Sequence, residues 1–533
     1  MYLPRSSPVG AEWNGLARRV NRDNTSLTLQ GLLTYRGQVS RDHGIDVVGG
    51  YETSKYVTSE VGTEARGFLT DAFTFDNLGA GATLVSPYSW REESRFVSVF
   101  GRTNYNYKDR YFLTGVLRYD GSSRFGTGHK WALFPAISAS WNIIGESFMR
   151  GSVFNDLRLR AGWGLQGNPG VPPYASLILL GTTDGARYVF GETPVTGVVP
   201  TRNGNPELKW EQTSQFNIAA EFSLLNSRLS GSVEYYVKNT KDLLLTVAVP
   251  QPALVSDRLE NIGKVRNRGV EGSLDWLALS RRNLTWRAGV VFSRDRNTVV
   301  NLGSAPFINT GGVSGQGQSG QNAERIIPGQ PLGTFYGPEF VGVDANGKQL
   351  FNHYVNGVLT GQTTAPGASD FVVLGNANPS FSVGLHSQVS WRRMDLSFLV
   401  RSEMGQKVFN NTGLVYSTKG NVLQDKNFLT SALPENDATG IHEPAIYSSR
   451  WVEDGSFVRL QNLTLGYTLP VAFLMGGSRS TRMYLSGDNL FLISGYSGLD
   501  PEVHAESGLA SRGIDYLSYP RPRTVTFGVN VAF

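Results

Sequence analysis

The chain ends in Thr524-Val-Thr-Phe-Gly-Val-Asn-Val-Ala-Phe533, a stretch in which two kinds of residue alternate without exception. The odd-numbered residues are large and apolar, and the even-numbered residues are small or polar. Successive side chains of a β-strand point to opposite faces, so a period of two predicts a strand between two different environments. This segment therefore indicates a sheet with one apolar face and one polar face.

The same period recurs along the chain, for example over residues 215–222, 229–238, 284–293 and 381–391. A soluble β-sandwich also alternates, so the period alone leaves a sandwich and a barrel open. Applied to the whole sequence, the pattern predicts fifteen strands, at residues 24–38, 45–59, 93–106, 110–120, 130–143, 155–165, 206–223, 228–249, 260–279, 284–300, 381–391, 394–410, 450–470, 480–493 and 520–533.

The connections between these strands favour a barrel. Short connections at 40–44, 107–109, 224–227, 280–283 and 392–393 alternate with long ones at 60–92, 166–205, 301–380, 411–449 and 494–519. Tight turns on one side and long loops on the other are typical of outer-membrane barrels, as are aromatic residues near the strand ends. We therefore predict an all-β, antiparallel transmembrane β-barrel over residues 24–533, with residues 1–23 as a loop or a truncated barrel start.

The strand count carries a second expectation. If the short turns are periplasmic, the first strand runs inward and the last strand also ends in the periplasm, so the count is odd. Bacterial single-chain barrels have even strand numbers. We therefore expect the C-terminal part, 14 to 16 strands, of a longer barrel.

Composition excludes several other classes. Charged residues are 17% of the chain, and the net charge of +5 is spread along it, which gives no support to nucleic-acid binding. With no cysteine and six scattered histidines, we expect no metal site and no cofactor. No run of 18 apolar residues is present, and the first fifteen residues lack the apolar core of a signal peptide. Either the protein is cytoplasmic, or Met1 is not its natural start.

Several segments resemble one family, the SusC/RagA-type TonB-dependent outer-membrane transporters. The clearest is Tyr107–Gly126 (YKDRYFLTGVLRYDGSSRFG), which looks like the family's signature hairpin. Others follow in the family's order: WALFPAISASW at 131–141, DLRLRAGWGLQGN at 156–168, NPELKWEQTS at 205–214, NIGKVRNRGVEG at 261–272, GNANPSF at 375–381, FVRLQNLTLGYTLP at 457–470 and YPRPRTVTFGVNVAF at 519–533.

The resemblance implies a barrel of about 22 strands filled by an N-terminal plug domain. It also implies a signal peptide, a TonB box, a SusD-like surface lipoprotein as partner, and uptake of oligosaccharides or peptides driven by the TonB complex. This sequence shows no counterpart of the plug or of the first strands, so we expect it to be a fragment that does not couple to TonB by itself.

Two other functions stay open at this point. A passive porin-like channel would need the wall to close without a plug, and unpaired strand edges are not tolerated in lipid. An enzyme barrel would need a nucleophile, a base and an orienting acid, and no such set or G-x-S-x-G motif is found. The adjacent Glu453 and Asp454 would point to opposite faces of a strand, and the Asp344–Lys348 segment is better explained as a turn than as a calcium loop.

The candidate site residues fall into two groups. Ligand contacts are expected among polar and aromatic residues of the long connections, with Trp90, Asp120, Trp210, Tyr336 and Tyr416 as candidates. In the last strand we expect lipid to contact Val525, Phe527, Val529 and Val531, and the lumen to contact Thr526, Asn530 and Ala532. The terminal Phe533 resembles the signal read by the barrel-assembly machinery, or belongs to a periplasmic aromatic girdle; both place the C-terminus in the periplasm.

Overall fold

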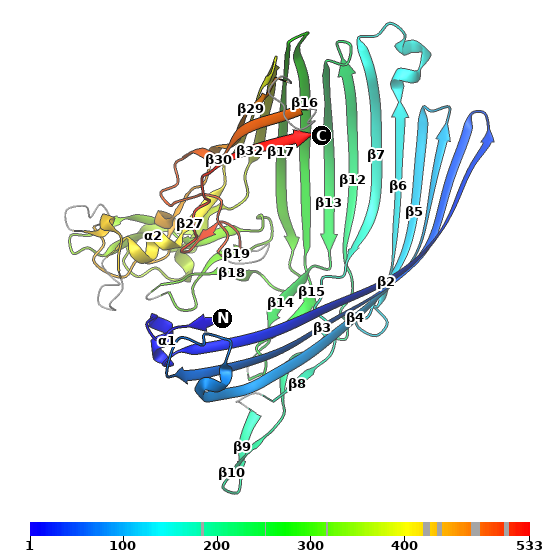
Figure 1. Ribbon diagram of the computed structural model, residues 1–533. Helices are drawn as coiled ribbons and strands as arrows, with labels where there is room; N and C mark the ends of the chain where they lie inside the picture. The colour runs from blue at the N-terminus through cyan, green and yellow to red at the C-terminus, as the bar shows by residue number, and fades with distance from the viewer. Residues whose placement is uncertain are drawn as a thin grey trace.

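The computed structural model describes residues 1–182, 186–250, 252–315, 318–418, 427–433, 440–470, 480–505 and 511–532. Its main feature is one curved, open, antiparallel sheet of 16 strands, called the wall below (Figure 1). In order across the sheet, these are β1 (Tyr2–Leu3), β2 (Leu16–Ser40), β3 (His43–Phe68), β4 (Gly81–Tyr107), β5 (Tyr111–Ser122), β6 (Trp131–Asn142), β7 (Phe154–Asn168), β12 (Glu211–Leu224), β13 (Leu229–Lys241), β16 (Lys264–Arg281), β17 (Leu284–Asn301), β25 (Phe381–Trp391), β26 (Met394–Met404), β29 (Phe457–Thr468), β30 (Ser480–Ser494) and β32 (Thr524–Ala532).

The all-β prediction is confirmed, and each of the fifteen expected strands corresponds to one long strand of the wall. Several boundaries differ. The first long strand begins at Leu16, eight residues before the expected start, and the stretch 394–410 is split into β26 and β27 (Lys407–Asn410). Gly405 separates these two strands with a φ of +87°, a left-handed conformation that turns the chain out of the wall.

Connections of two kinds lie at opposite rims of the wall (Figure 1). Tight turns such as Lys108–Asp109 and Arg392–Arg393 lie at one, the turn rim, where Lys108, Asp109 and Arg392 adopt positive φ values near 55°. The long connections lie at the other, the loop rim. The expected alternation of short and long connections along the chain therefore places all the short ones named here at one rim and the long ones at the other.

Pairing across the wall keeps like residues on one face. Residues paired in a ladder share a face, so consecutive pairings trace rows across the sheet. One row is apolar throughout: Phe527, Leu485, Leu465, Leu396, Val389 and Trp286. The neighbouring row is polar throughout: Thr526, Ser486, Thr464, Ser397, Gln388 and Arg287. These rows define the apolar face and the polar face of the wall.

Three long connections pack together at the loop rim, and we call their described residues the loop body: 302–380, 405–456 and 495–523. It contains β18 (Ile308–Gly312), β19 (Asn322–Ile326), β20 (Thr334–Pro338), β21 (Phe340–Val343), β22 (Gln349–Val355), β23 (Val358–Thr363), β24 (Phe371–Asn376), β27, α2 (Asn411–Tyr416), β28 (Val452–Asp454) and β31 (Ile514–Asp515). Its core joins all three segments, because Phe335, Phe409 and Ile514 belong to one buried cluster.

The remaining elements are short. They are α1 (Pro8–Glu12), the hairpin strands β8 (Leu179–Gly181), β9 (Arg187–Phe190), β10 (Thr193–Thr196), β11 (Val199–Arg202), β14 (Leu244–Ala248) and β15 (Asp257–Asn261), and single 3-10 turns at 78–80, 143–145, 147–149, 368–370, 430–432 and 449–451. Within the described ranges, no helix has the length and apolar character needed to span a membrane.

Candidate functional site

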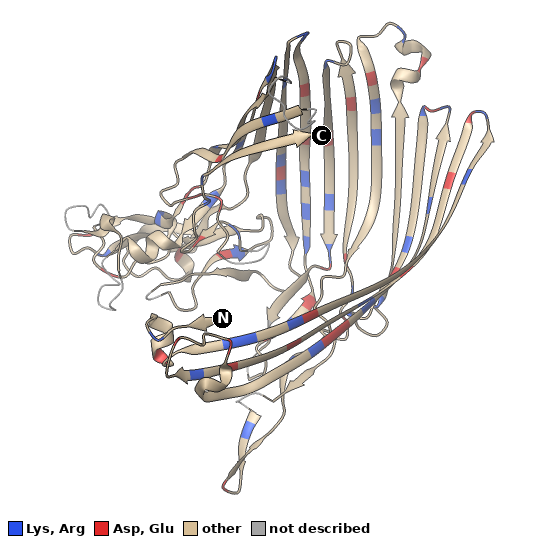
Figure 2. Cartoon of the chain, viewed as in Figure 1, with Lys and Arg blue, Asp and Glu red and all other residues tan. Residues whose placement is uncertain are grey.

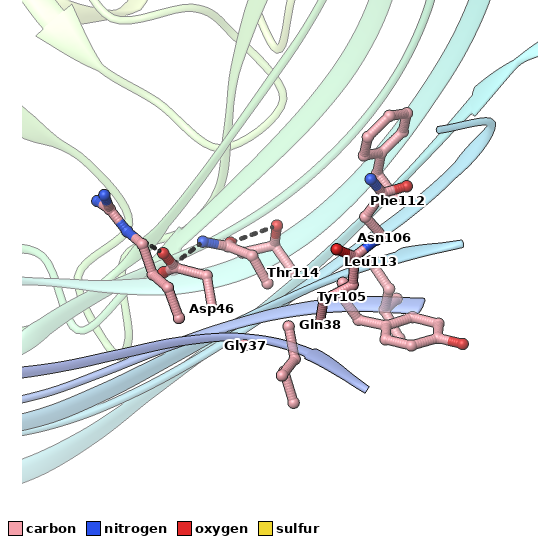
Figure 3. A pocket seen from close by; sticks show the side chains of 12 residues that line it. Gly37, Gln38, Asp46, Tyr105, Asn106, Phe112, Leu113 and Thr114 are labelled. Atoms are coloured by element: carbon pink, nitrogen blue, oxygen red, sulfur yellow. Dashed lines mark hydrogen bonds and ion pairs between the residues drawn. The ribbon is translucent and has the colours of Figure 1, made fainter. Parts of the chain in front are cut away.

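The polar face of the wall carries a continuous hydrogen-bond chain near the turn rim (Figure 3). Arg36 Nε donates to Asp46 Oδ2 at 2.8 Å, and Asn104 Nδ2 reaches Asp46 Oδ1 at 3.5 Å. Thr114 Oγ1 completes the chain by donating to Asn104 Oδ1 at 2.9 Å. These four residues belong to β2, β3, β4 and β5, so their side chains cross-link neighbouring strands on the polar side.

Trp90, a candidate ligand contact, lies on β4 in a second polar-face network nearer the loop rim. The guanidinium of Arg22 lies 5.6 Å from the centre of the Trp90 ring and donates to Glu60 Oε2 at 2.6 Å. Tyr88 Oη donates to the other oxygen of Glu60 at 3.0 Å. An aromatic face beside paired charges provides a surface for stacking and hydrogen bonding, the combination that sugar and peptide ligands use.

Asp120 is already engaged within the protein. It is 7% exposed, and Arg118 Nε donates to both of its carboxylate oxygens, at 2.7 and 2.9 Å. The same guanidinium lies over the rings of Phe96 and Phe100, at 5.8 and 5.2 Å. A ligand could contact Asp120 only by displacing Arg118.

Trp210 is buried. It is 3% exposed in a cluster with Phe125, Phe134 and Leu208, and its Nε1 donates to the carbonyl oxygen of Lys130 at 3.0 Å. This environment favours a packing role over the expected ligand contact. Phe96 joins Trp210 to Asp120, since the Phe96 ring lies 6.2 Å from Trp210 and under Arg118.

Tyr336 and Tyr416 belong to the loop body. The guanidinium of Arg325 lies 4.1 Å from the Tyr336 ring, and Tyr416, the last residue of α2, packs partly buried against the loop-body core. Of the five candidates, Asp120 and Trp210 lie near each other, with Phe96 between them. Trp90, Tyr336 and Tyr416 lie elsewhere. In the last strand, Val525, Phe527, Val529 and Val531 share the apolar face and are 45–69% exposed, while Phe533 lies outside the described residues.

The structure adds a groove that sequence reasoning missed. It has a volume of about 930 Å³ and lies in the loop body, lined among others by Asn410, Trp451, Glu453, Ser497, Asp515 and Tyr519. Glu453 is held by Asn410 Nδ2 at 2.9 Å and by the backbone N–H and hydroxyl of Ser497, both at 2.8 Å. These residues come from two connections, 405–456 and 495–523, with β29 and β30 between them in the sequence, so no local motif signals the groove.

A buried hydrogen bond holds Asp515, one of the residues that line this groove. Tyr496 Oη donates to Asp515 Oδ2 at 2.6 Å, and burial together with this carboxylate strongly raises the pKa of the Tyr496 hydroxyl. Tyr496 therefore remains a hydrogen-bond donor at any physiological pH. Among the described residues, no group of three or more His, Cys, Asp or Glu side chains is placed to hold a metal ion.

The loop body is tied to the wall by Arg459 of β29, which is 1% exposed. Its Nη2 lies 2.7 Å from Asp500 Oδ1 and 3.1 Å from Glu502 Oε2. Arg401 of β26 also pairs with Glu502. Two wall strands thus hold the 495–523 connection through charges, which positions the groove at the loop rim.

Comparison with known proteins agrees with this architecture. The profile of the family described as "TonB dependent receptor-like, beta-barrel" matches residues 4–490. TonB-dependent receptor P3 of Formosa agariphila is 32% identical over 561 residues, covering all of this chain and 55% of the relative. TonB-dependent receptor SusC of Bacteroides thetaiotaomicron is 30% identical over 479 residues, covering 87% of this chain and 46% of SusC.

A solved structure shows the same fold. The chain in "Structure of the RagAB peptide transporter" superposes with a TM-score of 0.83 at 24% identity, over 97% of this chain and 56% of that one. The architecture of the wall and the matched proteins place the chain in the class of outer-membrane β-barrels. The chain belongs to the TonB-dependent receptor-like β-barrel family. Within that family it is of the SusC/RagA type, as its segments predicted. It spans about half the length of the relatives it matches.

Proposed function

We propose that the protein is an outer-membrane, TonB-dependent nutrient transporter of the SusC type that takes up oligosaccharides or peptides. The observation that carries this function is the continuous separation of an apolar and a polar face across the wall. An apolar outer face suits lipid, and a polar inner face suits a hydrated path for a polar substrate. The loop body adds a structured ligand groove at one rim.

In this proposal the turn rim and the C-terminus lie in the periplasm and the loop rim faces outward. Val525, Phe527, Val529 and Val531 then contact lipid, whereas Thr526, Asn530 and Ala532 line the lumen. The rows through Phe527 and Thr526, each traced across six strands, support this assignment, because the first stays apolar and the second stays polar.

The proposed partners follow from the family. A SusD-like surface lipoprotein would meet the loop rim, the TonB complex would energise uptake, and the barrel-assembly machinery would insert the wall. The relatives extend well beyond the matched region, so we assign TonB coupling to parts of the longer protein other than this wall.

Uptake measurements test the transporter against a passive channel. Cells with and without the gene would be given fluorescent oligosaccharides and fluorescent peptides, with and without a protonophore. A transporter should lose uptake in the deletion strain and in protonophore-treated cells. Uptake that persists after the protonophore would support a porin instead, and unchanged uptake in the deletion strain would reject both.

The groove can be tested in the same assay. Glu453→Gln should raise the KM for uptake several-fold, because a neutral amide accepts weaker hydrogen bonds than a carboxylate. Asp454→Asn is the matched control, since Asp454 is adjacent but bonds Ser456 Oγ at 2.7 Å instead of lining the groove. Equal effects of the two variants would remove the groove from the substrate path.

A further inference from the structure

Four arginines lie together on the apolar face of β16 and β17, towards the loop rim. Arg266 and Arg268 belong to β16, and Arg294 and Arg296 belong to β17. The ladder sets Arg268 directly opposite Arg296, and all four side chains are exposed. Figure 2 shows the corresponding bands in the half of these strands nearer the long connections. Like charges directly opposite one another destabilise a sheet. An anion bound between these arginines would remove that repulsion.

The part of the protein that the structure describes supplies no such anion. Glu271 and Asp295, the acidic residues of the same strand segments, have the opposite parity and belong to the polar face; Asp295 accepts a hydrogen bond from Tyr236 there. Within the described ranges, none of the four arginines forms an ion pair. Arg266 Nε donates to the neutral Asn239 Oδ1 at 2.8 Å, and the other three arginines have no side-chain partner among the described residues.

In another cationic cluster on this face, a carboxylate of the protein itself neutralises the positive charges. On β3 and β4, Lys55, Arg91 and Arg95 surround Glu93, with nitrogen–oxygen distances of 3.1, 3.7 and 3.0 Å. One carboxylate thus serves three cations. Among the described residues, no carboxylate plays the part of Glu93 for the arginines of β16 and β17.

The position of the four arginines along the membrane normal indicates which layer of the membrane they contact. Arg294 follows Trp286 by eight residues on the same face, and Arg296 follows it by ten. At about 3.4 Å per residue and a tilt of about 40°, they lie roughly 20–26 Å from Trp286 along the membrane normal. The apolar band of such barrels is about 25 Å tall. With Trp286 at the turn-rim interface, the arginines reach the opposite interface, where lipid headgroups begin.

We propose that these four residues, the arginine patch, bind the phosphate groups of lipopolysaccharide in the outer leaflet. Guanidinium groups pair with phosphate through two parallel hydrogen bonds, and anionic headgroups attract cations placed at the membrane surface. A diphosphorylated glycolipid would neutralise the Arg268–Arg296 pair while its acyl chains cover Val270 and Phe292 on the same face. The inference rests on the outward orientation of the loop rim in the proposed function.

The test compares lipid binding by the full-length protein and by an Arg268→Gln/Arg296→Gln variant. Both would be purified in detergent, checked for the heat-modifiable mobility of a folded barrel, and titrated with diphosphorylated lipid A by native mass spectrometry. The double variant should bind at least about tenfold more weakly, since each interfacial cation contributes a few-fold to affinity. A Lys55→Gln/Arg95→Gln variant is the matched control and should bind like the wild type.

Two further arms identify the source of the phosphate. Phosphatase-treated lipid A should bind the wild type and the double variant equally weakly, and millimolar inorganic phosphate should not displace the intact lipid. Equal affinity of the wild type and the folded double variant for intact lipid A would overturn the inference, as would full displacement by free phosphate. Because binding is measured without transport, a failure of the uptake assay leaves this result unaffected.

Discussion

The wall and the loop body place their apolar side chains in opposite ways. In the wall, large apolar residues are on the surface, with Leu33 79% and Phe527 63% exposed. In the loop body, Phe335 and Phe409 are fully buried in a core shared by three connections. In the proposed function, lipid surrounds the apolar face of the wall, whereas the loop body has its own hydrophobic interior. The proposal therefore predicts that the membrane sets the stability of the wall and that internal packing sets the stability of the loop body.

The largest effect that would sharpen this contrast is expected from Phe409→Ala. Phe409 packs edge-on against Tyr447, with ring centres 4.8 Å apart, and its removal should destabilise the loop body by about 3–5 kcal/mol. Limited proteolysis in outer membranes should then cut the loop body while heat-modifiable mobility of the barrel persists. Phe527→Ala is the control and should leave the protease pattern unchanged. Simultaneous loss of barrel mobility in Phe409→Ala would show that wall and loop body are one cooperative unit.

An introduced charge should destabilise the wall to a different extent on each of its two faces. Val529→Arg, on the apolar face, should destabilise the barrel by up to about 2–4 kcal/mol, the cost of an arginine at the bilayer midplane, and Asn530→Arg, on the polar face, by much less. The folded fraction in urea titrations of the barrel in lipid vesicles measures the difference. Equal destabilisation would reject the assignment of the two faces.

Replacing a buried polar side chain with an apolar one should probe the interior of the loop body. Gln318 is buried; its Nε2 donates to the carbonyl oxygen of Ala445 at 2.7 Å, and its Oε1 accepts from the N–H of Tyr447 at 3.3 Å. Gln318→Leu leaves both backbone groups unsatisfied and should cost about 1–3 kcal/mol. Faster hydrogen exchange at Tyr447, with unchanged exchange in β16, is the expected readout. A uniform increase across both would contradict a local effect.

The smallest effect should be one of pH. The backbone N–H groups of Tyr354 and Gly367 and the His353 ring hold the pKa of the Asp370 carboxyl below its usual range. A depressed folded-state pKa gives stability that is present above the unfolded value, about 3.9, and is lost as pH falls through the folded value. Exchange at Tyr354 should thus accelerate only below about pH 4, and Asp370→Asn should abolish that acid-dependent step. An unchanged acid limb in Asp370→Asn would assign it to another group.

The same contrast explains what the sequence could predict. The parity of a residue in a wall strand decides its face, so residues 524–533 alone are enough to predict that Thr526 and Phe527 lie on opposite faces. The loop-body core depends on contacts such as Phe409 with Ile514, paired across more than a hundred residues, and no local period reports them. Trp90 and Trp210 look alike in sequence, yet one lies beside a charged pair and the other is buried. The burial of Trp210 depends on Phe125, from the connection between β5 and β6, and on Phe134 of β6, both distant from Trp210 in the sequence.

The shared core of three connections also constrains how this protein can diversify. A substitution that enlarges Phe409, Phe335 or Ile514 must be accommodated by the other two, so these connections cannot drift independently. New ligand preferences are then easier to gain by exchanging the whole set between homologous genes than by changing one segment. A chimaera that grafts residues 302–380 alone from a relative should misfold at the rim, whereas one that brings all three segments should keep its interior intact.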